Sequence, residues 1–305
     1  MKVLDLFSGC GGLSLGFQKA GYEIVGAYDA WDLAVKTYNA NMNHEATLFD
    51  LSDVEGLVKT VKKKSFDMII GGPPCQDFSS AGKRTEGDRA NLTGSYADIV
   101  TRLKPKYFLM ENVSRSKNSR AYELARKKLS GAGYGLTEVV LDASYCGVPQ
   151  IRKRFFCMGV MGEEDGFMLD IINSSISKKR MTVREYLGKE LDIEHYYRHP
   201  RNYSRRAVFS IDEPAATIRG VSRPVPSGYK GHHNDSSKVS KNIRALTSYE
   251  RSRIQTFPKN FNWLGSKTDI EQMIGNAVPV NLAKFVAECL NQYINQKSKK
   301  SKRAA

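Results

Sequence analysis

Residues 1–20 read MKVLDLFSGCGGLSLGFQKA, and this stretch decides the fold class. Val3–Phe7 is an apolar run typical of a short buried strand, residues 8–12 form a glycine-rich turn, and Leu13–Ala20 has the composition of a helix. Such a turn can hold a nucleotide-like ligand, because glycines let the backbone approach it at a helix N-terminus. Ser14 stands where a strict GxGxxG would have its third glycine, so an ordinary tight turn stays the alternative on these residues alone.

The alternation of strands and helices continues to about residue 160. Strands separated by helices predict an α/β fold with a mostly parallel, doubly wound sheet. Ligands of such sheets bind beyond the carboxyl ends of the strands, so residues that follow strands are the first candidates for chemistry. Further strands are expected at residues 23–28, 66–70, 107–110, 137–141 and 155–160.

The pattern changes after about residue 160, and residues 194–229 are irregular and rich in Arg, Tyr and Pro. We therefore predict a large α/β domain over residues 1–180, completed by 273–295, with a smaller inserted domain over 181–272.

Charge favours a polyanionic partner. The 305 residues carry 47 Lys+Arg against 32 Asp+Glu, a net charge of +15, which makes nucleic acid the first candidate. Residues 296–305 hold five basic side chains and no acid, and we predict a disordered tail there. Hydrophobic residues make up 41% of the chain, which excludes global disorder. Without a signal peptide or an apolar run of roughly 20 residues, we expect a soluble, cytoplasmic protein.

The cysteines point to nucleophilic chemistry rather than to a scaffold. There are five, with no CxxC pair and no zinc spacing, so we expect neither a disulfide framework nor a metal site. Cys75 follows Gly71–Pro74 at a strand end, where a rigid loop would hold its thiol out. A thiol whose pKa is lowered there would be a nucleophile. A merely packed thiol is the alternative.

Two strand-end residues suit a bound nucleoside. Asp29 lies 20 residues after Gly9 and could accept hydrogen bonds from ribose hydroxyls, or could cap a helix. Trp31 could stack on an adenine or pack as an ordinary aromatic side chain.

Three charged residues are candidates for catalysis. Glu111 follows an expected strand and could act as an acid or hydrogen-bond partner, with a solvated or helix-capping Glu as the alternative. Period-2 alternation places Arg152 and Arg154 on the same side of an extended segment, where both could bind an anion or a carbonyl oxygen. Surface salt bridges are the alternative for both.

Six blocks of sequence occur in an order that resembles the C5-cytosine DNA methyltransferase family. The resemblance spans residues 3 to about 290 and fades only around residues 190–240. The blocks are DLFSGCGGL (5–13), GPPCQDFS (72–79), ENV (111–113), QxRxR (150–154), RxLTxxExxRxQxFP (244–258) and GNAVP (275–279).

The resemblance implies that the larger domain, 1–180 with 273–295, is catalytic and binds S-adenosylmethionine as the cofactor, and that the inserted domain, 181–272, recognises the target. It also implies a catalytic mechanism. Cys75 would attack C6 of cytosine, and Glu111 would hold the N3/N4 edge and supply a proton. Arg154, with Arg152 supporting it, would bind the O2 side or a phosphate. The base must first be flipped out of the duplex.

The resemblance also implies the cofactor pocket, with Asp50 meeting the adenine amino group. The family often has Glu where this sequence has Ala30, so we assign ribose binding to Asp29. The remaining pocket residues carried over are Phe7, Gly9, Gly11, Leu13, Trp31, Leu51, Pro73, Leu92, Asn276 and Val278.

Residues 195–229 contain six arginines and no lysine, which suits bidentate contacts to guanine in double-stranded DNA. We predict Arg219 and Arg223 as base readers and Arg205 and Arg206 as phosphate contacts. The alternative for each is surface charge balance or packing on tyrosine. The other predicted DNA contacts are Gln76, Ser79, Thr217 and Gly220.

We therefore expect a monomeric, sequence-specific DNA cytosine-5 methyltransferase. The same family also resembles tRNA cytosine methyltransferases, but the separate arginine-rich region favours duplex DNA. A catalytically silent DNA-binding protein would not need Cys75, Glu111 and Arg154 together. An NAD-dependent oxidoreductase would leave Pro73–Gln76 and the basic region unexplained.

Overall fold

The computed structural model describes residues 1–74, 92–200, 202 and 205–304, and the chain divides into two compact units. Unit 1 comprises residues 1–141, 153–176 and 283 onward, and unit 2 comprises residues 142–152 and 177–282. The inserted domain predicted from the sequence, 181–272, did not include the segment 142–152.

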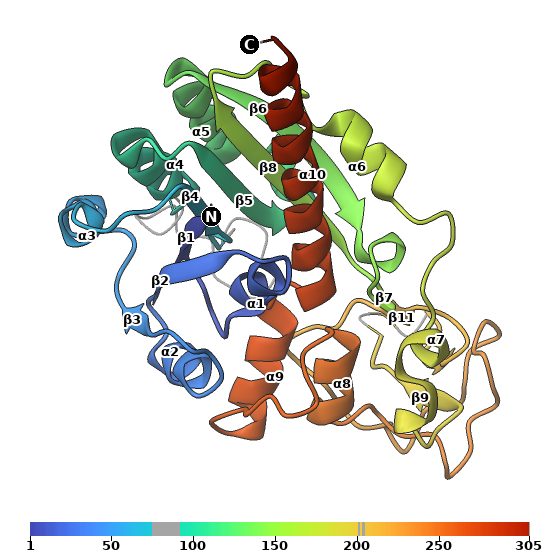
Figure 1. The fold of residues 1–305 in the computed structure, drawn as a ribbon. Coiled ribbons are helices and arrows are strands. Elements are labelled where there is room, and N and C mark those ends of the chain that lie inside the picture. The colour runs from blue at the N-terminus through green and yellow to red at the C-terminus, as the bar shows by residue number, and fades with distance from the viewer. Residues whose placement is uncertain (75–91, 201, 203–204, 305) are drawn as a thin grey trace. The chain divides into compact units, whose positions relative to one another are not determined.

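A seven-stranded sheet in the order β3-β2-β1-β4-β5-β8-β6 forms the centre of unit 1 (Figure 1). β1 pairs in parallel with β2 and β4, and the pairs β2–β3 and β4–β5 are also parallel. β8 runs antiparallel to β5. The predicted mostly parallel sheet is confirmed. The strands are β1 Lys2–Leu6, β2 Glu23–Asp29, β3 Ala46–Leu48, β4 Met68–Gly71, β5 Tyr107–Val113, β6 Tyr134–Asp142 and β8 Lys153–Met161.

Side-chain alternation along β1 explains how helices cover this sheet. Leu4 and Leu6 are fully buried in one apolar cluster with residues of α3, α4 and α5. Ile69 and Phe108 of the neighbouring strands join the same cluster. The helices of unit 1 are α1 Gly12–Lys19, α2 Asp32–Asn39, α3 Val54–Val61, α4 Leu92–Leu103, α5 Arg120–Gly131 and α6 Leu169–Ser175, together with most of α10.

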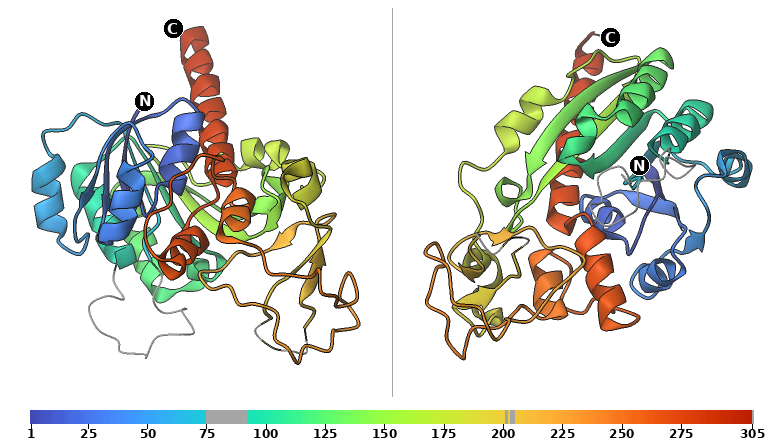
Figure 2. Two further views of the ribbon diagram at one scale, coloured as in Figure 1. Left: turned by 90° about the horizontal axis from the view of Figure 1, so that it is seen from below. Right: turned by 180° about the vertical axis from the view of Figure 1, so that it is seen from behind.

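Helix α10 spans Val280–Ala304 and joins the end of the chain to its beginning. The Tyr22 hydroxyl donates to the Ala287 carbonyl oxygen at 3.2 Å, and the Asn291 amide donates to that of Ala20 at 2.9 Å. The helix continues through the basic tail, which the sequence analysis expected to be disordered (Figure 2). Lys297 pairs there with Glu163, a contact that composition alone does not indicate.

Unit 2 has short strands and helices around its own core. Buried side chains of α7, β9, β10 and α8 form one cluster, which includes Val183, Tyr196, Phe209 and Ile254. Helices α7, α8 and α9 each start at a Ser or Thr whose side chain forms a reciprocal capping box. The elements are β7 Gln150–Ile151, β9 His195–Tyr197, β10 Val208–Ser210, β11 Ala215–Ala216, α7 Val183–Leu187, α8 Ser248–Ile254 and α9 Lys267–Asn276.

Candidate active site

The strand order of unit 1 reverses between β1 and β4, and this switch point defines the candidate crevice. Ligands of open α/β sheets bind beyond the carboxyl ends of the strands at such a point. Residues 7–12 follow β1 there, and Gly72–Pro74 follow β4. The sheet thus brings together two motifs that lie about 60 residues apart in the sequence.

The turn after β1 is held in an unusual backbone conformation. Phe7, Gly9 and Gly11 have φ angles of 58°, 53° and 94°. A Cβ added to Gly11 would lie 2.9 Å from a ring carbon of the fully buried Tyr38, whereas one added to Gly9 would meet nothing within 4 Å. Gly11 is therefore required by packing as well as by φ. Gly9 faces open space, as a ligand-binding position would.

Asp29 joins this turn to the start of α2. One carboxylate oxygen accepts from the Gly9 N–H at 2.7 Å, and the other accepts from the Trp31 N–H at 2.8 Å. Burial raises the pKa of Asp29, and these two backbone hydrogen bonds oppose the rise. Asp29 thus stabilises the loop itself, while Ala30, where the family often has Glu, is exposed.

The other predicted cofactor residues differ in exposure. Trp31, at the N-cap of α2, and Leu92, the first residue of α4, are half-buried. The Asp50 side chain is exposed and accepts from the Ser52 N–H at 2.9 Å, whereas Leu51 is 1% exposed. Asp50 can therefore reach a ligand, while Leu51 belongs to the core.

A buried chain of hydroxyl groups lies behind the glycine-rich turn. The Ser14 hydroxyl donates to Asp5 Oδ2 at 2.6 Å, and the Tyr38 hydroxyl donates to Ser14 Oγ at 2.8 Å. Asp5 is fully buried, and burial raises its pKa to about 7. The serine in the place of the third glycine is therefore part of an internal hydrogen-bond network.

Glu111 and Arg154 form a largely buried ion pair on neighbouring strands. Arg154 Nε lies 3.0 Å from Glu111 Oε1, and the side chains are 15% and 10% exposed. In the β5–β8 register Arg154 lies opposite Val113, so that Glu111 is its diagonal neighbour. Burial lowers the pKa of the Arg154 guanidinium, and the Glu111 carboxylate opposes this shift.

The loop after β4 is fixed beside this pair. The Asn112 amide donates to the Pro73 carbonyl oxygen at 3.0 Å, and a Cβ added to Gly72 would lie 3.2 Å from Glu111 Oε2. Pro73 is buried and Pro74 exposed. The predicted nucleophile Cys75 and the predicted DNA contacts Gln76 and Ser79 lie outside the described residues, immediately after this fixed point.

Arg152 lies in a different place from the one that alternation predicted. β7 ends at Ile151 and β8 begins at Lys153, so the extended segment is interrupted at Arg152. The Arg152 side chain is buried in unit 2 and donates to the carbonyl oxygens of Ile218, Gly275 and Ala277 at 3.0, 2.9 and 3.0 Å. It therefore holds backbone, where the sequence analysis expected it to support Arg154 in catalysis.

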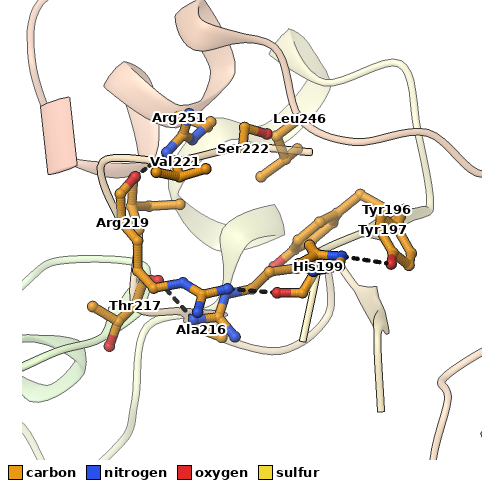
Figure 3. A pocket seen from close by; sticks show the side chains of 12 residues that line it. Tyr196, Tyr197, His199, Ala216, Thr217, Arg219, Val221, Ser222, Leu246 and Arg251 are labelled. Carbon is orange, nitrogen blue, oxygen red and sulfur yellow. Dashed lines mark hydrogen bonds between the residues drawn. The ribbon is translucent and has the colours of Figure 1, made fainter. Parts of the chain in front are cut away.

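The arginine-rich region contains a small pocket (Figure 3), lined among others by Tyr196, His199, Thr217, Arg219 and Val221. Arg219 donates to the His199 carbonyl oxygen across it. Burial lowers the pKa of His199, and the positive charges of Arg223 and Arg219 lower it further.

The predicted DNA contacts of this region fall into two groups. Arg205 and Arg223 are exposed, and within the described residues neither has a hydrogen bond or ion pair from its side chain. Arg206 instead pairs with Glu213 and lies over the Phe209 ring, 4.2 Å from its centroid. The Thr217 hydroxyl donates to the Ile151 carbonyl oxygen at 2.7 Å. A phosphate contact by Arg206 would require its pair with Glu213 to open.

Gly220 and the GNAVP block lie side by side in unit 2. A Cβ added to Gly275 would lie 2.1 Å from the Gly220 nitrogen, so this approach requires glycine. Of the two predicted cofactor residues here, Asn276 is exposed and Val278 is buried. The Asn276 amide oxygen accepts from the Gln272 side chain at 3.0 Å.

Sequence reasoning assigned no role to Arg251 and Gln255, two buried side chains that hold the backbone near Arg219 and the GNAVP block. Arg251 pairs with Glu271 at 3.1 Å and donates to the Arg219 carbonyl oxygen. Gln255 donates to the carbonyl oxygens of Ile274 and Ala277. The signal was present, because Arg251 and Gln255 are four residues apart and share one helical face, but nothing in the sequence names their partners.

Within the described residues, no group of three or more His, Cys, Asp or Glu side chains could hold a metal ion. In the same part of the chain, no helix combines the length and hydropathy of a membrane span.

The fold is that of a Rossmann-like α/β enzyme with its crevice at the switch point of the sheet. The chain belongs to the C-5 cytosine-specific DNA methylase family, whose model matches residues 1–292. It is an enzyme, a DNA (cytosine-5)-methyltransferase, and DNA is its substrate.

Several proteins resemble the chain over nearly its whole length. The Type II methyltransferase M.HindV of Haemophilus influenzae is 54% identical over 292 residues, 95% of this chain and 96% of that protein. M.HgiDI of Herpetosiphon aurantiacus is 52% identical over 300 residues, 97% and 96% of the two chains. The crystal structure of S. pombe Dnmt2 methyltransferase has a TM-score of 0.71 at 20% identity, covering 97% of this chain and 99% of its own. This last likeness concerns the fold.

Proposed function

We propose that the enzyme transfers the methyl group of S-adenosylmethionine to C5 of a cytosine flipped out of a short, specific duplex sequence. The observation that supports this most is the buried Glu111–Arg154 pair, fixed beside the loop that leads into Cys75. Because its relatives M.HindV and M.HgiDI are described as Type II methyltransferases, we propose a role in restriction–modification.

The crevice of unit 1 fits the proposed cofactor. Gly9 leaves open space at the switch point, and Phe7, Gly11 and Leu13 belong to the same turn or the helix that follows it. The exposed Asp50 carboxylate can accept from an adenine amino group, and Trp31 offers an aromatic ring. S-adenosylmethionine, when bound, supplies an electrophilic methyl group. Asp29 would reach the ribose only through lone pairs beyond those that hold Gly9 and Trp31.

Covalent attack by Cys75 would activate the cytosine. Its sulfur forms a bond to C6 while Glu111 holds a proton at N3, and the ring electrons move to C5, which becomes nucleophilic. Transfer of the methyl group to C5 would leave S-adenosylhomocysteine. A water molecule would then take the C5 proton, and the electron pair of the C5–H bond would re-form the C5–C6 double bond and break the bond from sulfur to C6. Cys75 leaves as the thiolate.

Arg154 would keep the Glu111 carboxyl group in one orientation. Its Nε lies 3.0 Å from Oε1, while Oε2 lies next to Gly72, on the side of the loop that carries Cys75. A second nitrogen of the guanidinium donates to the Lys153 carbonyl oxygen at 2.8 Å, which fixes its plane. A rigid pair of this kind places a proton donor without reorganisation during the reaction.

The test is methyl transfer from tritiated S-adenosylmethionine to duplex DNA, followed by bisulfite sequencing to identify the target. We expect label in cytosine of one duplex sequence. Label confined to tRNA would contradict the assignment to DNA.

A duplex with 5-fluorocytosine at the target should trap a covalent adduct, because the fluorine cannot leave as a proton. The Cys75→Ala variant should form none. Cys289→Ala is the matched control, since burial raises the pKa of that thiol to about 11 and it should not react. An adduct with Cys75→Ala would overturn the assignment of the nucleophile.

A further inference from the structure

Three buried side chains of unit 2 connect the predicted recognition segment with the GNAVP block. Gln150, Arg152 and Gln255 are 0%, 1% and 0% exposed. The Gln150 amide oxygen accepts from the Ile218 N–H at 2.9 Å, and its nitrogen donates to Gln255 Oε1 at 2.7 Å. Gln255 in turn donates to the Ala277 carbonyl oxygen at 3.2 Å.

Arg152 closes these contacts into a ring. Its guanidinium donates to the Ile218 carbonyl oxygen on one side and to those of Gly275 and Ala277 on the other. Both the N–H and the carbonyl group of Ile218 are thus held by side chains that also reach residues 274–277, either directly or through Gln255. We call Gln150, Arg152 and Gln255 the buried bridge.

The recognition segment itself, Thr217–Ser222, is fixed along most of its length. Arg198 donates to the Thr217 carbonyl oxygen at 3.0 Å, and Arg251 donates to that of Arg219. The Ser222 N–H donates to Glu271 Oε2 at 3.0 Å. A shift of the segment is therefore transmitted to the side chains that hold it, because breaking these partly buried hydrogen bonds would leave polar groups unsatisfied.

We infer that the buried bridge makes Arg152, Gln150 and Gln255 positioning residues that couple target recognition to cofactor binding. This inference rests on the proposed function, since Arg219 and Gly220 are predicted to meet DNA and Asn276 and Val278 the cofactor. A displacement of Ile218 on binding of the correct duplex is carried to Gly275 and Ala277, the neighbours of Asn276. The correct sequence then changes cofactor affinity.

The coupling is measured by equilibrium binding rather than by turnover. The dissociation constant of S-adenosylhomocysteine is determined by calorimetry with saturating target duplex and with a duplex that has one base pair changed. For the wild-type protein we expect the target duplex to give at least about fivefold tighter binding than the altered one. No difference in the wild type would overturn the inference.

Gln150→Met and Gln255→Met keep the side-chain volume but remove bridging hydrogen bonds. We expect both to reduce the difference between the two duplexes to less than about twofold. Arg198→Met is the matched control, because Arg198 holds the Thr217 carbonyl oxygen of the same segment and is not one of the three bridge residues. It should keep the fivefold difference at saturating duplex. An undiminished difference in either Gln variant would contradict the inference.

Urea unfolding identifies which variants are folded, and the inference is decided on those. Arg152→Lys, which keeps the charge but not the bidentate geometry, serves where a Gln variant does not fold. It should lose the coupling and retain adduct formation with 5-fluorocytosine. Loss of the adduct with unchanged coupling would restore the catalytic role predicted from sequence. Absence of methylation by the wild type would contradict the proposed function. The binding measurement would still test whether the buried bridge couples the two sites.

Discussion

At the scale of single residues, the Glu111–Arg154 pair contributes to stability and, in the proposed mechanism, also to chemistry. Both side chains are largely buried, so each charge depends on the other for compensation. A carboxyl group that must hold a proton for a substrate also has to be kept in place when the substrate is absent. Arg154 holds Oε1 of this carboxyl group, while Oε2 lies on the side of Gly72.

Removing either partner should have distinct effects. Glu111→Gln should lower kcat by ~10²–10⁴-fold, because the amide cannot transfer the proton. Arg154→Met should lower the free energy of unfolding by about 3 kcal/mol, since it leaves a buried carboxylate unpaired. The double variant should lose less stability than the sum of the two single variants. Urea unfolding and single-turnover kinetics measure both effects, and strict additivity would mean that the pair contributes no coupling.

The two arginines of the QxRxR block show what a pattern predicts and what it does not. Alternation predicted that both side chains lie on the same side of an extended segment, which assumes one continuous strand. The strand is interrupted at Arg152, and the two guanidinium groups therefore lie in different units of the chain. Which groups each arginine binds depends on segments that are distant in the sequence, and the local residue types do not indicate them.

At the scale of elements, the turn after β1 separates two reasons for glycine. Gly9 and Gly11 both have positive φ, but only at Gly11 would a side chain also meet Met42 and Tyr38. Gly21, in the turn after α1, has φ of 90° and open space around it. It offers the same backbone strain at a distance from the switch point.

Alanine at these three positions should separate strain from ligand binding. Gly9→Ala and Gly21→Ala should each cost about 1–2 kcal/mol of stability from the left-handed backbone alone, and Gly11→Ala should cost more. Only Gly9→Ala and Gly11→Ala should weaken binding of S-adenosylhomocysteine, as calorimetry would show. Equal affinity of Gly9→Ala and wild type would mean that Gly9 is not at the cofactor.

Most strands of the sheet could be predicted, because each is a short apolar run followed by Gly, Pro or a polar residue. β3 could not, since only one of its three residues is buried. The sequence predicted no helix at α3 or α9, although Asp53 and Ser266 cap them. A capping residue is a single polar side chain, and among other polar residues it does not stand out. The basic tail was predicted as disordered from its charge, yet α10 continues to Ala304.

At the scale of the whole molecule, a buried carboxyl group makes stability depend on pH. Burial raises the pKa of Asp5 from about 4 to about 7, and its Oδ1 has no hydrogen bond within the described residues. Between these values the folded protein holds a proton that the unfolded chain releases, so the stability contributed by Asp5 is complete below pH 4 and lost as pH rises to 7.

The Asp5→Asn variant removes this titration and keeps an acceptor for Ser14. Its free energy of unfolding, relative to wild type, should rise between pH 4 and pH 8 by at most about 4 kcal/mol. Other titrating groups are common to both proteins and cancel in the difference. Urea unfolding at several pH values measures it, and a difference that does not change with pH would mean that Asp5 titrates normally.

The composition of unit 2 has a practical consequence for chimeric enzymes. An exchange of residues 177–282 alone between relatives would transplant the predicted recognition segment with the Ile218 carbonyl group that Arg152 binds and the Ile218 N–H that Gln150 binds. It would leave the Arg152 and Gln150 side chains behind in the host. A graft that is to keep its specificity must carry the eleven residues 142–152 as a second fragment. The exchangeable unit of this enzyme therefore consists of two separate pieces of the chain. A successful exchange needs four splice boundaries, whereas exchange of 177–282 alone needs two.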